Sequence, residues 1–140
     1  MCRFRPSKSR WRRSGAAAAE LALALPFLML LFAVAVDYCR VFYVTQTLQN
    51  CAWVGAMYAS GTSRNPSAAS ATAAAQQAAV AEGTSLNPPL TAAQVSVSFA
   101  GTTAVVTVQY QFQAVTPLMG NGGTVTLTRT ITMTMASTGP

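Results

Sequence analysis

Residues 15–36, GAAAAELALALPFLMLLFAVAV, decide how this chain is organised. The run from Ala16 to Val36 would be about 31 Å long as a helix, which matches a bilayer hydrocarbon core of about 30 Å. It contains Pro26, which membrane helices tolerate better than soluble ones. It also contains one carboxylate, Glu20, near its N-terminal edge. The sequence therefore predicts a membrane helix over residues 16–36 that carries an energetically costly charge.

The charge of the chain is concentrated in front of this run. Only 9% of the 140 residues are charged, and the net charge is +6. Basic residues that flank an apolar segment stay on the cytoplasmic side, so we expect the N-terminus inside and the C-terminus exported. Contacts with anionic lipid are an alternative role, whereas nucleic-acid binding is not expected of so short a basic leader. The basic residues of this leader are Arg3, Arg5, Lys8, Arg10, Arg12 and Arg13.

The helical pattern continues beyond the apolar run. Residues 37–60 contain no proline and only one glycine, Gly55, and their apolar residues recur at steps of three and four. We therefore expect one helix from about Ala16 to Ser60. Asp37 and Arg40 are spaced i, i+3 and could pair at the membrane interface. The residues of the recurring face are Val41, Val44, Leu48, Cys51, Ala52, Gly55, Ala56 and Ala59.

Three cysteines are present, at positions 2, 39 and 51. On one continuous helix Cys39 and Cys51 are about 18 Å apart, which is too far for a disulfide. Packing as small apolar residues and an intermolecular bridge on the oxidising, exported side both stay open.

The rest of the chain, residues 61–140, predicts a small α+β domain. An alanine-rich helix is expected at about residues 66–82, with Pro66 at its first position, and residues 84–91 are interpreted as a linker. Period-two alternation then predicts strands at about residues 94–99, 104–113 and 124–135 in an antiparallel meander.

One charge interrupts the apolar face of this meander. Arg129 falls on that face, so we expect it either on an edge strand or at a bulge. A pairing with Glu82 is a further possibility.

A sheet with one apolar face must bury that face against other secondary-structure elements. The candidates are residues 37–60 of the long helix and the alanine-rich helix. The predicted fold is therefore α+β and pilin-like: a long, partly transmembrane N-terminal helix packed against a small antiparallel β-meander, with a second short helix.

The residue types present argue against an enzyme. The chain has no histidine, its three cysteines are scattered, and its serines and threonines have no base to activate them. The glycine cluster GNGG, at 120–123, lies between two predicted strands and not before a helix, so it does not suggest a phosphate loop. We expect no catalytic residue, no metal, no cofactor and no small-molecule substrate, and instead a structural or interactive role.

Three interpretations compete for residues 10–40. The segment is an uncleaved signal anchor, a secretory signal peptide cut after Ala35 at the AVA of residues 33–35, or a prepilin-type leader cut after a glycine on the cytoplasmic side. The last leaves the whole apolar helix on the mature protein.

The order of features over about residues 10–60 resembles TadE-like proteins, the minor pilins or pseudopilins of tight-adherence (Flp-type) pilus systems. The features that match are the basic stretch, Gly15 followed by AAAAE (16–20), LALP (23–26), the acid-x-x-Arg of Asp37 and Arg40, FYV (42–44), LQN (48–50) and the small residues through GAMYA (55–59). The resemblance implies cleavage by a prepilin peptidase between Gly15 and Ala16. It also implies other pilins and an inner-membrane assembly platform as partners.

Cleavage at that point would make Glu20 the fifth residue of the mature chain. The new α-ammonium on Ala16 of a neighbouring subunit could offset the cost of the Glu20 carboxylate, so Glu20 would set the register of a helical bundle. Simple snorkelling of Glu20 to the membrane edge is the alternative. The small residues Ala52, Gly55, Ala56 and Ala59 would allow close helix packing.

Overall fold

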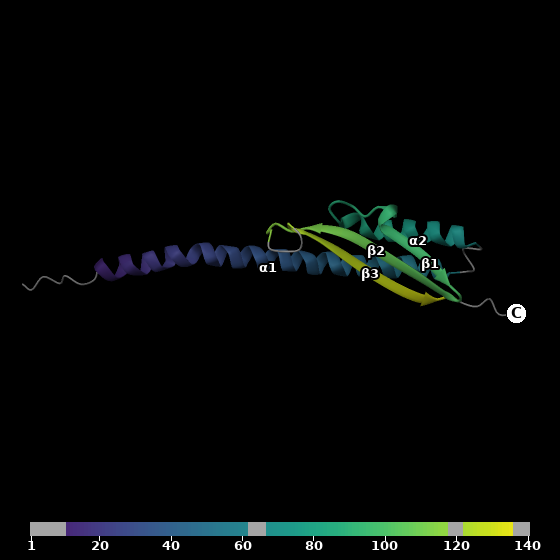
Figure 1. Ribbon diagram of the computed structural model, residues 1–140, viewed down its shortest axis with the longest axis horizontal. Helices are drawn as coiled ribbons and strands as arrows, with labels where there is room; N and C mark the ends of the chain where they lie inside the picture. The colour runs from purple at the N-terminus through teal and green to yellow at the C-terminus, as the bar shows by residue number, and fades with distance from the viewer. Residues whose placement is uncertain (1–10, 62–66, 118–121, 136–140) are drawn as a thin grey trace, which may run out of the picture. The chain divides into compact units, whose positions relative to one another are not determined.

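The computed structural model describes residues 11–61, 67–117 and 122–135. Its elements are α1 (Trp11–Ser60), α2 (Ala68–Glu82), two short 3-10 turns (Gly83–Ser85 and Ala92–Gln94) and the strands β1 (Val95–Ala100), β2 (Thr103–Gln113) and β3 (Thr124–Thr134) (Figure 1). The predicted α+β fold is confirmed: a long N-terminal apolar helix, a short second helix and a three-stranded antiparallel sheet. Residues 1–10, most of the predicted basic leader, lie outside the described residues, as does Cys2.

The chain divides into two compact units, residues 1–36 and residues 37–140. In the first unit α1 continues through Pro26 without a break, although proline has no N–H to donate to the carbonyl of Ala22. The helix begins at Trp11, five residues before the expected start at Ala16. A glycine costs a helix only about 1 kcal/mol, so Gly15 does not stop it.

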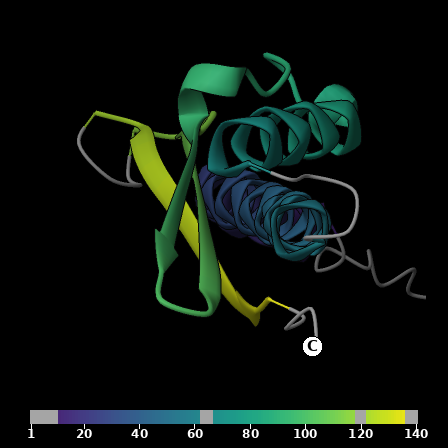
Figure 2. The ribbon, with the colours of Figure 1, turned by 90° about the vertical axis from the view of Figure 1, so that its right-hand side faces the viewer.

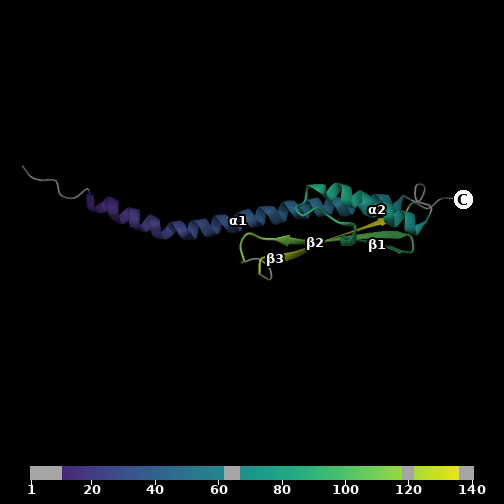
Figure 3. The ribbon, with the colours of Figure 1, turned by 90° about the horizontal axis from the view of Figure 1, so that it is seen from above.

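The second unit has two layers. Figures 2 and 3 show residues 37–60 of α1 and the whole of α2 on the same face of the sheet. The strands follow the order β1-β2-β3, so β2 is central and β3 is an edge. The pairing of β2 with β3 runs without a bulge from Thr103↔Thr134 to Gln113↔Thr124.

Alternation along the strands produces the core. On β2 every second residue is buried, whereas the intervening threonines and glutamines are partly or fully exposed. The residues of α1 that recur at three- and four-residue steps are buried in the same core from Val44 onward, and Val41 is partly buried against it. The buried apolar residues of this core include Val44, Leu48, Cys51, Ala52, Ala56, Ala75, Ala79, Val95, Val106, Val108, Tyr110 and Phe112.

The second helix begins two residues later than expected. Its N-cap is Ser67, whose hydroxyl accepts a hydrogen bond from the backbone N–H of Ser70 at 3.1 Å, while Ser70 Oγ accepts one from the N–H of Ser67. This capping box fixes the first turn. Pro66, expected at the first helical position, lies outside the described residues.

The segment interpreted as a linker is part of the core. Leu86 and Leu90 are 4% and 2% exposed and belong to the same core cluster as Cys51. The peptide bond between Asn87 and Pro88 is cis. The prolines at 88 and 89 and Asn87 predicted a linker, and two leucines are too few to establish a periodic pattern against that signal.

Candidate functional site

The first candidate segment is the predicted processing and register site in residues 15–36. Gly15, Ala16 and Glu20 all lie on α1 and are exposed. A Cβ placed on Gly15 would meet nothing within 4 Å. No hydrogen bond or ion pair joins Glu20 to another of the described residues. Cleavage after Gly15 and pairing of Glu20 with another subunit remain predictions.

This part of α1 has the properties of a membrane span. By length and composition, the helix over Gly15–Ser60 is able to cross a membrane; its best 18-residue window has a mean hydropathy of 2.4 and no buried residues. Large apolar side chains are exposed along it, such as Leu23 at 82% and Phe32 at 67%. Such a surface is costly in water and is expected in lipid.

The second candidate site surrounds Asp37, the first residue of the second unit. Its side chain has no exposed surface. One carboxylate oxygen, Oδ1, accepts a hydrogen bond from the backbone N–H of Val115 at 2.8 Å. The other, Oδ2, accepts from the N–H and the hydroxyl of Thr116 at 2.7 and 2.8 Å. These bonds tie α1 to the chain just after β2.

These contacts lower the pKa of Asp37 below its ordinary value of 3.8. The main cause is the hydrogen bond from Val115, assisted by those from Thr116 and by the charge of Arg40, while burial acts in the opposite direction. The carboxylate is therefore ionised at neutral pH, and its charge is held by donors on the loop.

Arg40 lies near Asp37, as its spacing predicted, with Nη1 3.5 Å from Oδ1. The guanidinium carbon lies 5.1 Å from the centre of the Phe112 ring, in the range of a cation–π contact. Whether this pair marks the membrane interface remains a prediction. Val115 and Thr116 could not be predicted as partners, since their bonds to Asp37 use mainly backbone groups 78 and 79 residues away.

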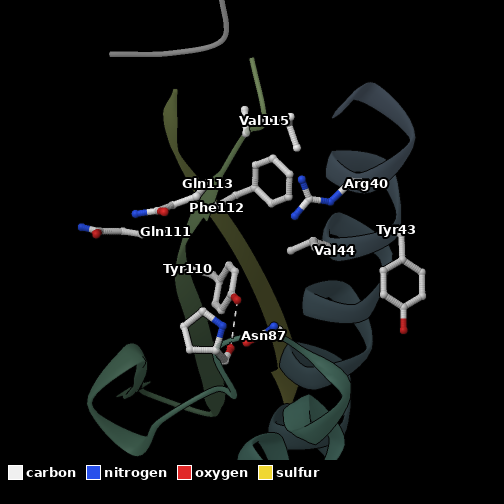
Figure 4. Close-up of a pocket in the computed structure, with 11 residues that line it drawn as sticks. Arg40, Tyr43, Val44, Asn87, Tyr110, Gln111, Phe112, Gln113 and Val115 are labelled. Atoms are coloured by element: carbon white, nitrogen blue, oxygen red, sulfur yellow. Dashed lines mark hydrogen bonds between the residues drawn. The ribbon is translucent and has the colours of Figure 1, made fainter. Parts of the chain in front are cut away.

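A pocket of about 540 Å³ opens between α1, β2 and the chain around Pro88 (Figure 4). Arg40 and Val44 line it from α1, and the rings of Tyr110 and Phe112 line it from β2. The Tyr110 hydroxyl donates a hydrogen bond to the carbonyl oxygen of Pro88 at 2.9 Å, which fixes one wall. Burial raises the pKa of Tyr110, so this hydroxyl stays protonated.

The small residues predicted to pack helices are buried inside the second unit. Ala52 and Ala56 are fully buried, and Ala59 is 2% exposed. At Gly55, a Cβ would lie 3.3 Å from the carbonyl oxygen of Ala75 on α2 and 3.3 Å from Val106 Cγ1 on β2. Their contacts are therefore made within the chain, between α1, α2 and the sheet.

The remaining polar candidates are not brought together. Arg129 lies on β3, an edge strand, half-buried, and donates a hydrogen bond to the carbonyl of its neighbour Thr128 at 2.9 Å. Of its expected placements, the edge strand is the one found; the bulge is not, and within the described residues no ion pair joins it to Glu82. Cys39 is exposed and Cys51 is buried, and both thiols are free. Burial raises the pKa of the Cys51 thiol to about 11.

The described residues contain no group of three His, Cys, Asp or Glu side chains that could hold a metal ion. No curated protein and no solved structure matches the chain. A family model does match: residues 15–57 fit the family described as TadE-like protein. The match begins at Gly15 and includes Glu20, Asp37 and Arg40. The resemblance to TadE-like proteins drawn from the sequence is thereby confirmed over residues 15–57.

Proposed function

We propose that this protein is a minor pilin or pseudopilin that takes part in assembling a tight-adherence type IV pilus at the inner membrane. The observation that carries the proposal is the TadE-like match, which starts at Gly15, the glycine of the predicted cleavage site. An apolar helix able to span a membrane follows at once. The role is structural and not enzymatic.

In this proposal, a prepilin peptidase cuts between Gly15 and Ala16 on the cytoplasmic side. The mature chain keeps residues 16–36 in the membrane and exports residues 37–140. Glu20 then lies about one helical turn from the new α-ammonium, close enough to the membrane edge to meet the amine of a neighbouring subunit. That pairing would stabilise one helix register over the others, because a subunit displaced along the bundle axis would leave the carboxylate unpaired.

The alternative is an unprocessed, membrane-anchored exported β-domain with a generic adhesive or scaffolding role. The polar outer face of the sheet, on which the Thr107 and Thr130 hydroxyls lie 2.9 Å apart, is the observation that favours it. Serine, threonine and glutamine side chains make up most of this face, with Val105 among them.

The mass of the mature N-terminus separates these possibilities. We expect the membrane-bound protein isolated from its own host to begin at Ala16, as determined by peptide mass spectrometry. A chain beginning at Met1 or Cys2 would support the unprocessed anchor, and one beginning at Val36 would identify a secreted protein. A Gly15→Val variant, which should block a glycine-specific cut without disturbing the neighbouring packing, is the matched control.

A further inference from the structure

The carboxylate of Asp37 is satisfied without Arg40. Three donors, the N–H groups of Val115 and Thr116 and the Thr116 hydroxyl, lie 2.7–2.8 Å from its oxygens. The contact with Arg40 is longer, at 3.5 Å. A guanidinium carries five N–H donors, and this is its one hydrogen bond to the described residues. Most of the donor capacity of Arg40 is therefore available to a ligand.

Arg40 is nevertheless held in place. Its guanidinium stacks on the Phe112 ring, and its side chain is 48% exposed. Figure 4 shows the guanidinium between Phe112 and Val44 at the edge of the pocket. The other walls are mixed: Val44, Pro88, Phe112, Ala114 and Val115 are apolar, whereas Tyr43, Asn87, Tyr110, Gln111 and Gln113 carry polar groups. A fixed cation beside a pocket with both apolar and polar walls suits a ligand that combines an anion with carbon-rich and hydrogen-bonding groups.

The position of Arg40 along the chain indicates the source of that ligand. If residues 16–36 span the hydrocarbon core, as the proposed function holds, Arg40 lies four residues beyond it, or about 6 Å along the helix. Headgroup layers add roughly 5–7 Å on each side of the core. Arg40 is then at the depth of the lipid phosphates of the exported leaflet.

We propose that this pocket binds the headgroup of a membrane glycerophospholipid, with the phosphate on Arg40. Arginine matches phosphate oxygens with two parallel N–H bonds, and such charge-assisted bonds are among the strongest in proteins. The headgroup carbons beyond the phosphate cover the apolar walls, and the acyl chains stay in the bilayer. Free phosphate would satisfy Arg40 but leave those walls in water, which favours the lipid.

The test measures lipid retention by the full chain, purified in detergent, by native mass spectrometry. The probes are palmitoyl-oleoyl phosphatidylglycerol and the diacylglycerol with the same acyl chains, which lacks the phosphate. We expect the wild type to retain the phospholipid in preference to the diacylglycerol, and Arg40→Gln to bind it about tenfold more weakly. Arg40→Lys, which keeps the charge but not the fork of donors, should retain an intermediate amount. Arg129→Gln is the matched control and should behave as wild type.

Three outcomes would overturn the proposal: equal phospholipid retention by wild type and Arg40→Gln, equal retention of diacylglycerol and phospholipid, or displacement of the lipid by millimolar inorganic phosphate. Should Arg40→Gln fail to fold, as judged by circular dichroism, Phe112→Leu decides instead. It keeps the charge and removes the stacking ring, and unchanged lipid retention in it would contradict the site.

This inference rests on the membrane anchoring in the proposed function, but the two fail in different ways. A chain that is not cut at Gly15 and still shows Arg40-dependent lipid retention would refute the processing and leave the lipid site standing. A processed chain that supports pilus assembly and retains lipid equally well in Arg40→Gln would do the reverse.

Discussion

At the scale of single residues, Asp37 has closer partners in the fold than the one that its neighbours in the sequence predicted. Its i, i+3 spacing to Arg40 predicted a local ion pair, and that pair exists at 3.5 Å. The shorter contacts, however, come from Val115 and Thr116. A buried carboxylate with three donors is costly to alter, because a side chain with fewer acceptor oxygens leaves at least one of these donors without a good partner.

We predict that Asp37→Asn lowers the thermal unfolding midpoint of the protein at pH 7. An amide has one acceptor oxygen, and its NH₂ group would face the N–H donors of the loop. Thr116→Val, which removes only the hydroxyl donor, should have a smaller effect. Unfolding followed by circular dichroism measures both, and an unchanged midpoint in Asp37→Asn would contradict the role assigned to the carboxylate.

The same prediction extends to pH. The pKa of Asp37 is lower in the folded chain than its ordinary value of 3.8, so ionised Asp37 stabilises the fold fully above about pH 4. That contribution is lost as the pH falls through the lowered pKa. The difference in midpoint between wild type and Asp37→Asn should therefore shrink on acidification. Glu82→Gln, a change at an exposed carboxylate, serves as the control that should track wild type throughout.

At the scale of elements, periodicity was sufficient for most of the fold. The three strands and residues 37–60 of α1 were predicted from the spacing of their apolar residues, whereas α2 was predicted from its alanine content. The buried contacts that the sequence did not predict lie outside the helices and strands, or use backbone groups. Leu86 and Leu90 are buried in a proline-rich segment, and the Asp37 contacts use backbone groups that no side-chain pattern reveals.

Gly55 is the point where three elements meet most closely, so it offers a test of this packing. We predict that Gly55→Leu destabilises the fold by about 1–3 kcal/mol, since added side-chain atoms would press on the Ala75 carbonyl and on Val106. Trp53→Leu, on the exposed face of the same helix, should change the free energy of unfolding by less than about 0.5 kcal/mol. Chemical denaturation measures both values, and equal effects would show that α1 is not packed as described.

At the scale of the whole molecule, the residues that indicate a function are concentrated in the N-terminal half of the chain. The family match covers residues 15–57 and stops before α2 and the sheet. The fold of the remainder was predictable from alternation, but its role was not, because a threonine-rich strand face such as that of β3 has many uses and no diagnostic spacing. The lipid pocket escaped prediction for a related reason: its walls come from three separate segments of chain.

The prediction that belongs to this scale concerns Glu20. We expect Glu20→Ala to leave membrane insertion intact and to abolish pilus assembly or partner binding, because the carboxylate is needed only when subunits associate. Membrane fractionation and electron microscopy of a host carrying the variant provide the two readouts. Glu82→Ala, at an exposed acid in the second unit, should leave piliation normal. Normal piliation in Glu20→Ala would refute the register role.

The bonds to Asp37 also set an order of events during synthesis. They join residues 78 and 79 positions apart in the chain, so they cannot form until nearly all of residues 37–117 have been made and have reached the same compartment. Until then the carboxylate must stay hydrated, since burying it without these three donors would be costly. Closure of this long loop is entropically slow and comes late. The Asp37 carboxylate is thus fully hydrogen-bonded only when the chain as far as Thr116 is present, and a chain truncated before Val115 would leave it open to water.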